Sequence, residues 1–523
     1  MRRQFVLIGG GHASVSTARA LRRLEFDGHI IIVGDESVPP YQRPPLSKEY
    51  LQGESDLDEM WSAPLDWYAA NDVELRLNTR VSRINLGTLD VELDDGTKLV
   101  ADAVLLATGG RPRHLAGVKD SAVRYLRTVR DADLLRNDIQ KDSHVVVVGA
   151  GFIGAEVAAT ARGLGAKVTL LETMENPLQR IVGKEIGQVC AKMHRDHGVD
   201  LRCGVVVEDV TEEGSKKLVK LDNGETLEAD IVVVGIGIDP NDEIARASEI
   251  TVGNGIRVDE FCRTSAEGVY AAGDVANHYH PLFDRRMRVE HYDNATKQGI
   301  VAAKNMMGIR TVFDEPHWFW SDQYDHNLQY AGHVEKWDEI VIRGSLEDFD
   351  FTAFYMVGGK IGAVFAIDRG ADVMASKALI ADQVEVDTAK LRDEDVDLQD
   401  ILSGYAEEEE IGQAQEAPDN EGEYLKAARS GQVTEGLVRR FIVGGVELAI
   451  ARSKGKTYAV HNLCTHLACH LASGKVSDNC LTCLCHGSMF ELDTGIPVNP
   501  PATKPVKTYP AKEKNGHIYV KVS

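Results

Sequence analysis

The chain opens on "FVLIGGGHASVSTARAL" (residues 5–21), and this stretch decides the fold class. An apolar run typical of a buried strand leads into a glycine turn and then into a helical pattern. The frame is Gly9-x-Gly11-x-x-Ser14: Gly9 permits the tight turn, Gly11 lets the backbone approach a pyrophosphate, and small Ser14 lets the helix pack on the strand. The helix N-terminus would offer unpaired N–H groups to the phosphates. The stretch therefore predicts a dinucleotide-binding unit.

The residues that follow support this interpretation. A second apolar strand, "HIIIVGDE" (29–36), ends near Asp35, about where an acid accepts hydrogen bonds from the ribose hydroxyls. A glycine frame alone is weak evidence, but here strand, helix, strand and acid follow one another in order.

The same pattern recurs in "HVVVVGAGFIGAEVAATARGLGAKVTLLE" (144–172), with the frame Gly149-x-Gly151-x-x-Gly154 and Glu172 at the end of its second strand. Two such units predict two dinucleotides, one at each site. The carboxylate of Glu172 accepts from a free 2′-hydroxyl and repels a 2′-phosphate, and no arginine follows it closely. The second site is therefore predicted to prefer NADH over NADPH.

Two further strand-and-turn segments, "VLLATGGRPR" (104–113) and "GVYAAGDVAN" (268–277), suggest a flavin as the first dinucleotide. Asp274 has two interpretations. It is a turn aspartate, or it is a carboxylate that holds the ribityl chain of the flavin together with neighbouring backbone.

A cluster of cysteine and histidine, "CTHLACHLASGKVSDNCLTCLCHGS" (464–488), lies near the other end of the chain. Its frame is Cys464-x-His466, sixteen residues, then Cys483-x-x-His486. Zinc would accept two sulfur and two nitrogen ligands, although zinc fingers usually pair like with like on each knuckle. The mixed frame is the Rieske spacing, in which one iron of a [2Fe–2S] cluster takes both cysteines and the other takes both histidines. We favour the cluster over zinc and over a group without metal.

Composition sets outer limits on function. With 523 residues the chain is expected to form three or four domains. Its net charge of −23 argues against nucleic acid as a partner. No run of 18 apolar residues predicts a membrane span, and the N-terminus resembles a first strand and not a signal peptide, so a cytoplasmic protein is expected.

Five motifs in the first 400 residues together resemble the ferredoxin reductases among the FAD-dependent pyridine nucleotide-disulfide oxidoreductases, a group that includes the apoptosis-inducing-factor-like proteins. They are "PYQRPPLSKEYL" (40–51), "ATGGRPR" (107–113), "GAGFIGAEVA" (149–158), "AAGDVAN" (271–277) and "WFWSDQY" (318–324). The resemblance implies an α/β protein with two Rossmann-like domains. Residues 1–110 and 235–318 would bind FAD, 111–234 would bind NAD(H), and 319–400 would form an α+β C-terminal domain.

The likeness also assigns roles at the reacting groups. Arg43 and Lys48 would contact FAD, with Lys48 near the flavin N5 edge, Glu156 near the nicotinamide and Trp320 beside the isoalloxazine. Hydride transfer needs no general base, so positioning and electrostatic roles are expected. Tyr292 stands where many members carry tryptophan, which leaves the packing there uncertain.

A larger set of residues is predicted to contact FAD and NAD(H). They are Gly9, Gly11, His12, Ala13, Ser14, Asp35, Arg43, Lys48, Val81, Ala107, Thr108, Gly109, Arg111, Gly273, Asp274, Glu290, His291, Tyr292, Ala295 and Trp320 for the flavin, and Gly149, Gly151, Phe152, Ile153, Gly154, Glu156, Glu172, Gly235, Ile236 and Gly237 for the nicotinamide nucleotide.

Residues 423–523 resemble the all-β Rieske ferredoxin domains, which implies Cys464, His466, Cys483 and His486 as cluster ligands. The flanking "CTHLAC … CLCHGS" resembles the Rieske proteins of quinol-oxidising complexes, and that likeness implies a Cys469–Cys485 disulfide. The alternative is two reduced thiols packed as small hydrophobic groups. An acidic linker, 401–422, would join this domain to the reductase.

Disulfide-reducing flavoenzymes of this fold carry two cysteines just after the first glycine loop, and residues 30–80 hold none. The sequence therefore predicts an NADH-dependent reductase that passes electrons through FAD to its own Rieske cluster and then to an external acceptor, such as an oxygenase. One alternative is a redox-sensing interaction protein like apoptosis-inducing factor, with slow NADH turnover. Another is a Rieske domain that its own flavin does not reduce. A homodimer is left open.

Overall fold

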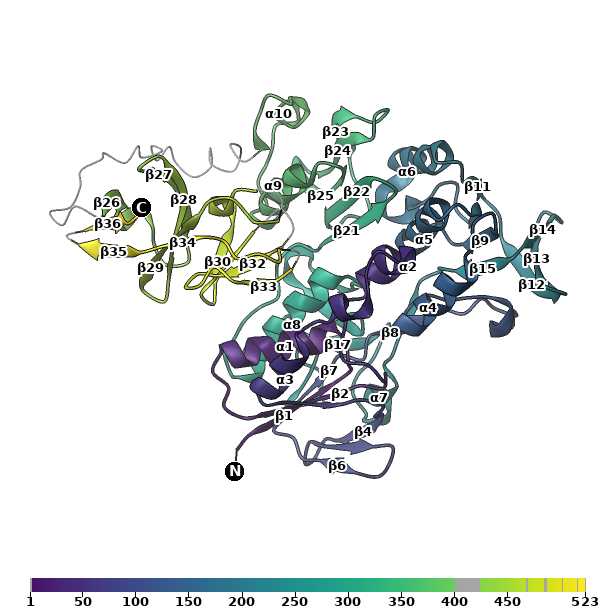
Figure 1. Ribbon diagram of the computed structural model, residues 1–523, viewed down its shortest axis with the longest axis horizontal. Helices are drawn as coiled ribbons and strands as arrows, with labels where there is room; N and C mark the ends of the chain where they lie inside the picture. Colours follow the sequence, from purple (N-terminus) through teal and green to yellow (C-terminus); the bar gives the residue numbers. More distant parts are fainter. Residues whose placement is uncertain are drawn as a thin grey trace. The chain divides into compact units, whose positions relative to one another are not determined.

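The structure is a computed structural model that describes residues 2–398, 401, 424–466, 469–483, 487–500, 502–514 and 516–522 (Figure 1). The chain forms two compact units. The first comprises Met1–Asp368 and Ile380–Asp393, and the second Arg369–Leu379 and Glu394–Ser523. Each unit is described by itself. In the described part of the chain, no helix is long and apolar enough to cross a membrane.

The first sheet of the first unit is parallel and draws its strands from distant segments. Its order is β18-β7-β1-β2-β3. The strands are β1 (Gln4–Ile8), β2 (His29–Val33), β3 (Val73–Arg76), β7 (Ala103–Leu106) and β18 (Val269–Ala271). Helix α1 (His12–Arg23) packs closely on α8 (Tyr292–Met306), where a Cβ on Gly299 would lie 2.7 Å from the Ala13 oxygen. Buried strands of a parallel sheet read as continuous apolar runs, as "FVLI" and "IIIV" do.

A second parallel sheet, in the order β11-β10-β9-β15, contains the second glycine loop. Its strands are β9 (His144–Val148), β10 (Lys167–Glu172), β11 (Asp200–Cys203) and β15 (Ile231–Val234). Helices α4 (Val129–Asp138), α5 (Phe152–Gly163) and α6 (Gln179–Asp196) belong to this region, with an antiparallel sheet of β12 (Val207–Glu213), β13 (Lys216–Leu221) and β14 (Thr226–Ala229).

The third large sheet is antiparallel and has the order β21-β22-β25-β24-β23. Its strands are β21 (Trp318–Gln323), β22 (His326–Gly332), β23 (Glu339–Ser345), β24 (Asp350–Val357) and β25 (Lys360–Ile367). Phe351, Phe365 and Tyr355 are fully buried in its core. Helices α9 (Gly370–Ala381) and α10 (Thr388–Arg392) follow it in the chain.

Shorter elements complete the first unit. The strands are β4 (Val81–Asn85), β5 (Asp90–Leu93), β6 (Lys98–Leu99), β8 (Gly110–Pro112), β16 (Ile238–Pro240), β17 (Ile256–Val258), β19 (Ala276–His280) and β20 (Arg285–Arg288). The helices are α2 (Glu49–Gln52), α3 (Leu65–Ala70) and α7 (Glu243–Ala247), with 3₁₀ turns η1 (Pro44–Ser47), η2 (Leu57–Met60), η3 (Asp120–Ala122) and η4 (Pro281–Phe283).

The described part of the second unit beyond residue 423 is built from short antiparallel strands in three sheets. They are β26 (Leu425–Arg429), β27 (Val438–Val443), β28 (Val446–Ser453), β29 (Lys456–His461), β30 (Lys475–Ser477), β31 (Cys480–Thr482), β32 (Met489–Glu491), β33 (Pro497–Asn499), β34 (Thr508–Tyr509), β35 (Ala511–Lys514) and β36 (His517–Val520), with 3₁₀ turns η5 (Ser430–Gln432) and η6 (Leu471–Ser473).

The predicted fold class, with two nucleotide-binding α/β regions, an α+β region and an all-β domain, is confirmed. The exact domain boundaries stay predictions. The predicted acidic linker at 401–422 lies outside the described residues except for residue 401.

Candidate active site and cluster loops

One connected cavity of about 2410 Å³ crosses the first unit, where both parallel sheets direct the ends of their strands. It is lined by the residues that follow β1 and β9, which carry the two glycine loops. Ligands of parallel α/β sheets bind outside the carboxyl ends of the strands, so the cavity lies where such a fold binds nucleotides. Every predicted flavin or nicotinamide contact lines it except Ser14 and Gly154.

The first glycine loop leaves room for a ligand on one side and none on the other. Gly9 has φ +120°, and a Cβ there would lie 2.1 Å from the Ala107 carbonyl oxygen. A Cβ on Gly11, in contrast, would meet nothing within 4 Å. Gly9 is therefore required by the turn, whereas Gly11 keeps the backbone open toward the cavity, as a pyrophosphate requires.

The second loop repeats this arrangement. Gly149 has φ +99°, with a Cβ there 2.6 Å from the Gly235 oxygen, and Gly151 again faces open space. Gly154 is a packing position, since its Cβ would lie 1.9 Å from the Gly149 oxygen. Gly154 and its counterpart Ser14, which is fully buried, are both absent from the cavity wall.

Glu172 is held rigidly at the end of β10. Its Oε2 accepts from the Ala150 N–H at 2.8 Å, within the glycine loop. Its Oε1 accepts from the Met174 N–H at 2.9 Å and from the Thr173 hydroxyl at 3.0 Å. The acid is thus fixed beside the turn that would hold the nucleotide, in an orientation suited to ribose hydroxyls.

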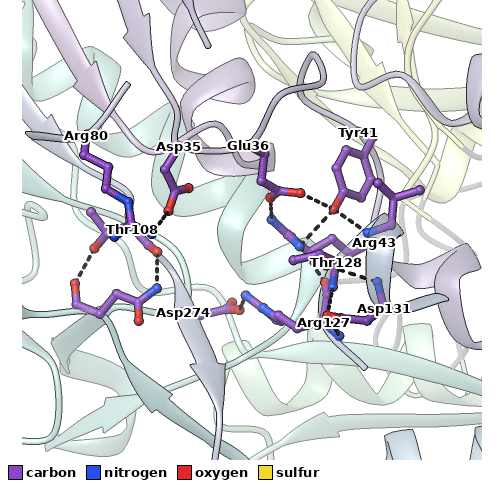
Figure 2. A network of polar contacts seen from close by, with 12 residues as sticks. Asp35, Glu36, Tyr41, Arg43, Arg80, Thr108, Arg127, Thr128, Asp131 and Asp274 are labelled. Carbon is purple, nitrogen blue, oxygen red and sulfur yellow. Dashed lines mark hydrogen bonds and ion pairs between the residues drawn. The ribbon is translucent and has the colours of Figure 1, made fainter. Parts of the chain in front are cut away.

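Near the first loop the acid that the sequence singles out is less constrained. Asp35 contacts Arg80 at 3.5 Å, and both side chains are exposed. Its neighbour Glu36 is instead tied to Arg43 at 2.5 Å and to the Tyr41 hydroxyl at 2.7 Å. Figure 2 shows Arg43 between these two groups and the segment of Arg127 and Thr128. Glu36 was missed by the sequence reasoning, although it adjoins Asp35.

A second ion pair in Figure 2 joins Arg127 to Asp274 at 2.7 Å, with both side chains half-buried or better. Asp274 therefore is more than a turn residue, because its carboxylate points into the cavity wall and has a cationic partner. No motif in the sequence pointed to Arg127, since the pairing spans 147 positions.

The predicted positioning residues meet in one buried polar group formed by three segments. Lys48, after η1, lies 3.0 Å from Glu156 Oε1 on α5, and the Glu156 side chain is 3% exposed. The Ser47 hydroxyl donates to Glu156 Oε2 at 2.5 Å, and the Ser321 hydroxyl of β21 donates to Oε1 at 2.7 Å. Buried carboxylates persist when they are paired and hydrogen-bonded, and this one has both kinds of partner. The two serines lie inside quoted motifs but were not singled out.

Aromatic rings line the cavity near these charges. His12 stacks on Tyr292 with ring centroids 3.8 Å apart, and Tyr292 lies edge-on to Trp320 at 6.0 Å. His291 stacks on Phe319 at 3.8 Å. Burial lowers the pKa of His12 to about 3 and that of His291 to about 4, so both imidazoles are neutral near pH 7. Flat, uncharged surfaces of this kind suit an isoalloxazine ring.

The second unit holds two similar loops around its cysteines. The Cys464 N–H donates to the Cys469 oxygen at 2.8 Å, and the Cys483 N–H donates to the Ser488 oxygen at 2.7 Å, so each loop closes after five residues. Both cysteine side chains are buried, and His466 is partly buried with its pKa lowered by burial. Two thiols and an imidazole on matched tight loops fit the donor set of a Rieske cluster.

Two residues that were predicted to belong to the cluster loops cannot be described from the structure. His486 and Cys485 lie outside the described residues. Cys469 is disulfide-bonded, and its predicted pairing with Cys485 stays a prediction.

Residues 3–299 match the family model of the pyridine nucleotide-disulphide oxidoreductases. The chain belongs to this family. Residues 318–402 of the oxidoreductase match the reductase C-terminal model, and residues 423–510 match the Rieske [2Fe–2S] domain model.

Curated and solved relatives agree with this assignment. The oxidoreductase is 40% identical over 402 residues to the ferredoxin–NAD(+) reductase component of the anthranilate 1,2-dioxygenase system of Burkholderia cepacia, covering 76% of this chain and 99% of that one. It is 39% identical to putidaredoxin reductase of Pseudomonas putida, covering 76% and 96%. The crystal structure of the covalent putidaredoxin reductase–putidaredoxin complex matches with a TM-score of 0.75, 37% identity, and coverage of 78% and 99%.

The cofactors of the oxidoreductase are FAD, NADH and a [2Fe–2S] cluster. The open faces of Gly11 and Gly151 and the orientation of Glu172 fit the two dinucleotides, and the buried thiols of Cys464 and Cys483 fit the cluster. The contacts of single residues with these groups stay predictions.

Proposed function

We propose that this oxidoreductase passes electrons from NADH through FAD to its own Rieske cluster, and from there to an external acceptor. FAD supplies the exchange between two-electron and one-electron transfer, and the cluster supplies a one-electron carrier. The observation that carries the proposal is the presence of both donor sets in one chain, the double glycine-loop cavity and the paired cysteine loops.

The part of the chain that the reductase relatives match supports electron transfer to the chain's own Rieske cluster. The match to the anthranilate dioxygenase reductase component spans 99% of that relative but 76% of this chain, so almost nothing of the relative corresponds to the last quarter. The matching putidaredoxin reductase structure is that of a covalent complex with a second protein, putidaredoxin. In this chain the Rieske domain at residues 423–510 would take the place of such a second protein.

The chain's own residues serve binding and orientation. Glu172 and the second glycine loop would hold NADH, with the carboxylate accepting from the ribose hydroxyls and repelling a 2′-phosphate. Lys48, which lies 3.0 Å from Glu156, would place its amino group at the reacting ends of the two nucleotides. The absence of a cysteine pair in residues 30–80 directs electrons away from a thiol acceptor.

An anaerobic NADH titration of the loaded protein, followed by EPR, tests the proposal. We expect the signal of the reduced cluster to appear after one equivalent of NADH. The matched control is the full-length Cys464→Ser variant, in which the flavin is bleached but no cluster signal develops. Flavin reduction without a cluster signal in the loaded wild type would contradict the proposal. Slow turnover with ferricyanide and NADH-dependent dimerisation would instead favour a redox-sensing protein.

A further inference from the structure

Three buried histidines meet at a place that has no part in the proposed electron route. His278 and His280 lie on one face of β19, and His317 directly precedes β21. They are 1%, 0% and 6% exposed, and one nitrogen of each lies within 4.8 Å of the others. Three imidazoles are a common ligand set for zinc, so the question is whether these three can bind a metal.

In His280 and in His317, Nε2 has a hydrogen-bond partner, and this bond fixes the tautomer of the ring. His280 Nε2 lies 3.0 Å from the Glu315 carbonyl oxygen, which can only accept, so the proton is on Nε2 and the lone pair on Nδ1. His317 Nε2 lies 2.9 Å from the Met287 thioether sulfur, a weak acceptor, so its lone pair is also on Nδ1. Both rings are therefore in a tautomer that could bind a metal.

His278 has the opposite tautomer, and Gln298 is the cause. The Gly273 N–H donates to Gln298 Oε1 at 2.9 Å, which fixes the orientation of the amide. The amide nitrogen then lies 3.0 Å from His278 Nδ1 and can only donate to it. The proton of neutral His278 is thus on Nε2.

The charge state of the three rings supports these assignments. Burial lowers the pKa of His278 to about 3, with His280 and Arg286 adding to the effect. Burial also lowers the pKa of His280 and His317. Each ring consequently carries a single proton near pH 7, which is what the tautomer assignment requires.

The nitrogens of these rings without a partner among the described residues are His278 Nε2, His280 Nδ1 and His317 Nδ1, and we infer that these are the three that face one another, here called the inner nitrogens. Within the described part of the chain, none of these three buried atoms has a hydrogen-bond partner. They offer one N–H and two lone pairs. A metal bound by all three would need His278 to move its proton to Nδ1, directly against the N–H of Gln298.

We propose that the three histidines bind one water molecule and that Gln298 closes the site to metal ions. A water molecule accepts one hydrogen bond and donates two, which complements one N–H and two lone pairs. Two nitrogens each about 2.8 Å from one water oxygen are roughly 4.6 Å apart, within the spacing of the cluster. Buried waters typically make about three hydrogen bonds to groups that otherwise lack partners.

The bound water would connect two parts of the cofactor cavity. His317 lines that cavity, and so does Gly273, whose N–H is held by Gln298. The chain of contacts runs from Gly273 through Gln298, His278 and the water to His317. Gln298, itself fully buried, is therefore a positioning residue for the turn that carries Asp274.

Given these tautomers, we expect one substitution to convert the water site into a metal site. In Gln298→Glu, the carboxylate can accept from both the Gly273 N–H and a proton on His278 Nδ1. His278 Nε2 then becomes a lone pair, and a carboxylate–histidine–metal arrangement is complete. The substitution differs from the wild type by one amide group, so the two proteins are closely matched.

The test measures zinc in tag-free protein loaded with FAD and cluster, after incubation with zinc chloride and desalting. We expect Gln298→Glu to retain one zinc per chain more than the wild type, and Gln298→Glu/His280→Phe to lose that increment. A wild-type protein that itself loses one zinc per chain on His280→Phe would overturn the proposal. Equal zinc in the wild type and a folded Gln298→Glu variant would also overturn it.

A crystal structure of the wild type at high resolution keeps the proposal testable if Gln298→Glu does not fold. The expected result is one density peak about 2.7–3.1 Å from each inner nitrogen, with no anomalous signal at the zinc edge. No peak, or a peak about 2.0–2.1 Å from the nitrogens with such a signal, would contradict a bound water.

Discussion

The two glycine loops of the first unit share a frame and differ in how tightly they close. In the second loop, the Ala155 N–H lies 2.9 Å from the Gly151 oxygen, and a Cβ on Gly154 would lie 1.9 Å from the Gly149 oxygen. In the first loop, the equivalent distance from the Val15 N–H to the Gly11 oxygen is 3.4 Å. Ser14, which takes the position of Gly154 in the first loop, is fully buried.

The acidic residue that follows the second loop is also held more tightly than the one that follows the first loop. Glu172 is fixed by three hydrogen bonds, one of them from within the loop, whereas Asp35 is exposed and contacts Arg80 at 3.5 Å. The comparison teaches that one motif can serve two purposes. The acid of the second loop is preorganised, whereas near the first loop the ion pairs lie at Arg43 with Glu36 and at Arg127 with Asp274.

Replacing Gly154 of the second loop with serine, the residue at the equivalent position of the first loop, should have the largest effect. Gly154→Ser places a Cβ against the Gly149 oxygen, and overpacking of this kind costs up to about 3 kcal/mol. If this cost falls on the loop, NADH binding weakens by roughly 100-fold while FAD content is kept. The measurement is the dissociation constant for NADH with FAD content as the control. The reverse change, Ser14→Gly, should cost below about 1 kcal/mol, and equal effects of the two changes would contradict the comparison.

Glu172→Gln should have the next largest effect. The amide nitrogen cannot accept the N–H bonds that the carboxylate accepts, and a hydrogen bond to a charged group contributes about 1.5–3 kcal/mol. We expect the dissociation constant for NADH to rise roughly 10-fold or more, and the preference over NADPH to shrink. An unchanged ratio of the KM values for NADH and NADPH would show that Glu172 does not contact the ribose hydroxyls.

His12→Phe makes the first loop resemble the second, which carries Phe152 at this position. The pKa of His12 is lowered to about 3 by burial and by Arg19, so the folded state does not take up the proton that the unfolded state gains below its ordinary pKa of 6.5. Stability is thus lost as the pH falls from 6.5 toward 3, by about 2 kcal/mol at pH 5. Urea unfolding at pH 7 and pH 5 should show a smaller loss in the variant by about this amount. An identical pH dependence of both proteins would be the contrary result.

Asp35→Asn should have the smallest effect. Its ion pair with Arg80 is exposed, and exposed pairs contribute about 0–1 kcal/mol. FAD content after dialysis and the unfolding midpoint should stay close to those of the wild type. Release of FAD from Asp35→Asn but not from Arg80→Gln would mean that the aspartate binds the cofactor directly.

The sequence was sufficient wherever the signal is local. Both glycine loops, the strands around them and the spacing of Cys464 and Cys483 lie within short segments, because strand, turn and helix follow one another in the chain. The positions of Gly11 and Gly151 toward open space follow from the same frame.

Long-range pairings could not be predicted in this way. Arg127 reaches Asp274, and Ser321 reaches Glu156 across 165 positions, so neither leaves a periodic pattern in the sequence. The three histidines were missed for a related reason, since His278 and His280 alternate on one strand like ordinary core residues and His317 joins them from another segment. The ion pair of Glu36 with Arg43 was also not predicted, and the predicted contact of Asp35 with the ribose stays a prediction.

The central claim is that electrons pass from the flavin to the cluster within one chain. Anaerobic stopped-flow mixing of the loaded protein with NADH, repeated over a tenfold range of protein concentration, tests it most directly. We expect cluster bleaching to follow flavin reduction at a rate independent of protein concentration. A rate that rises in proportion to protein concentration, or a cluster that stays oxidised, would contradict it.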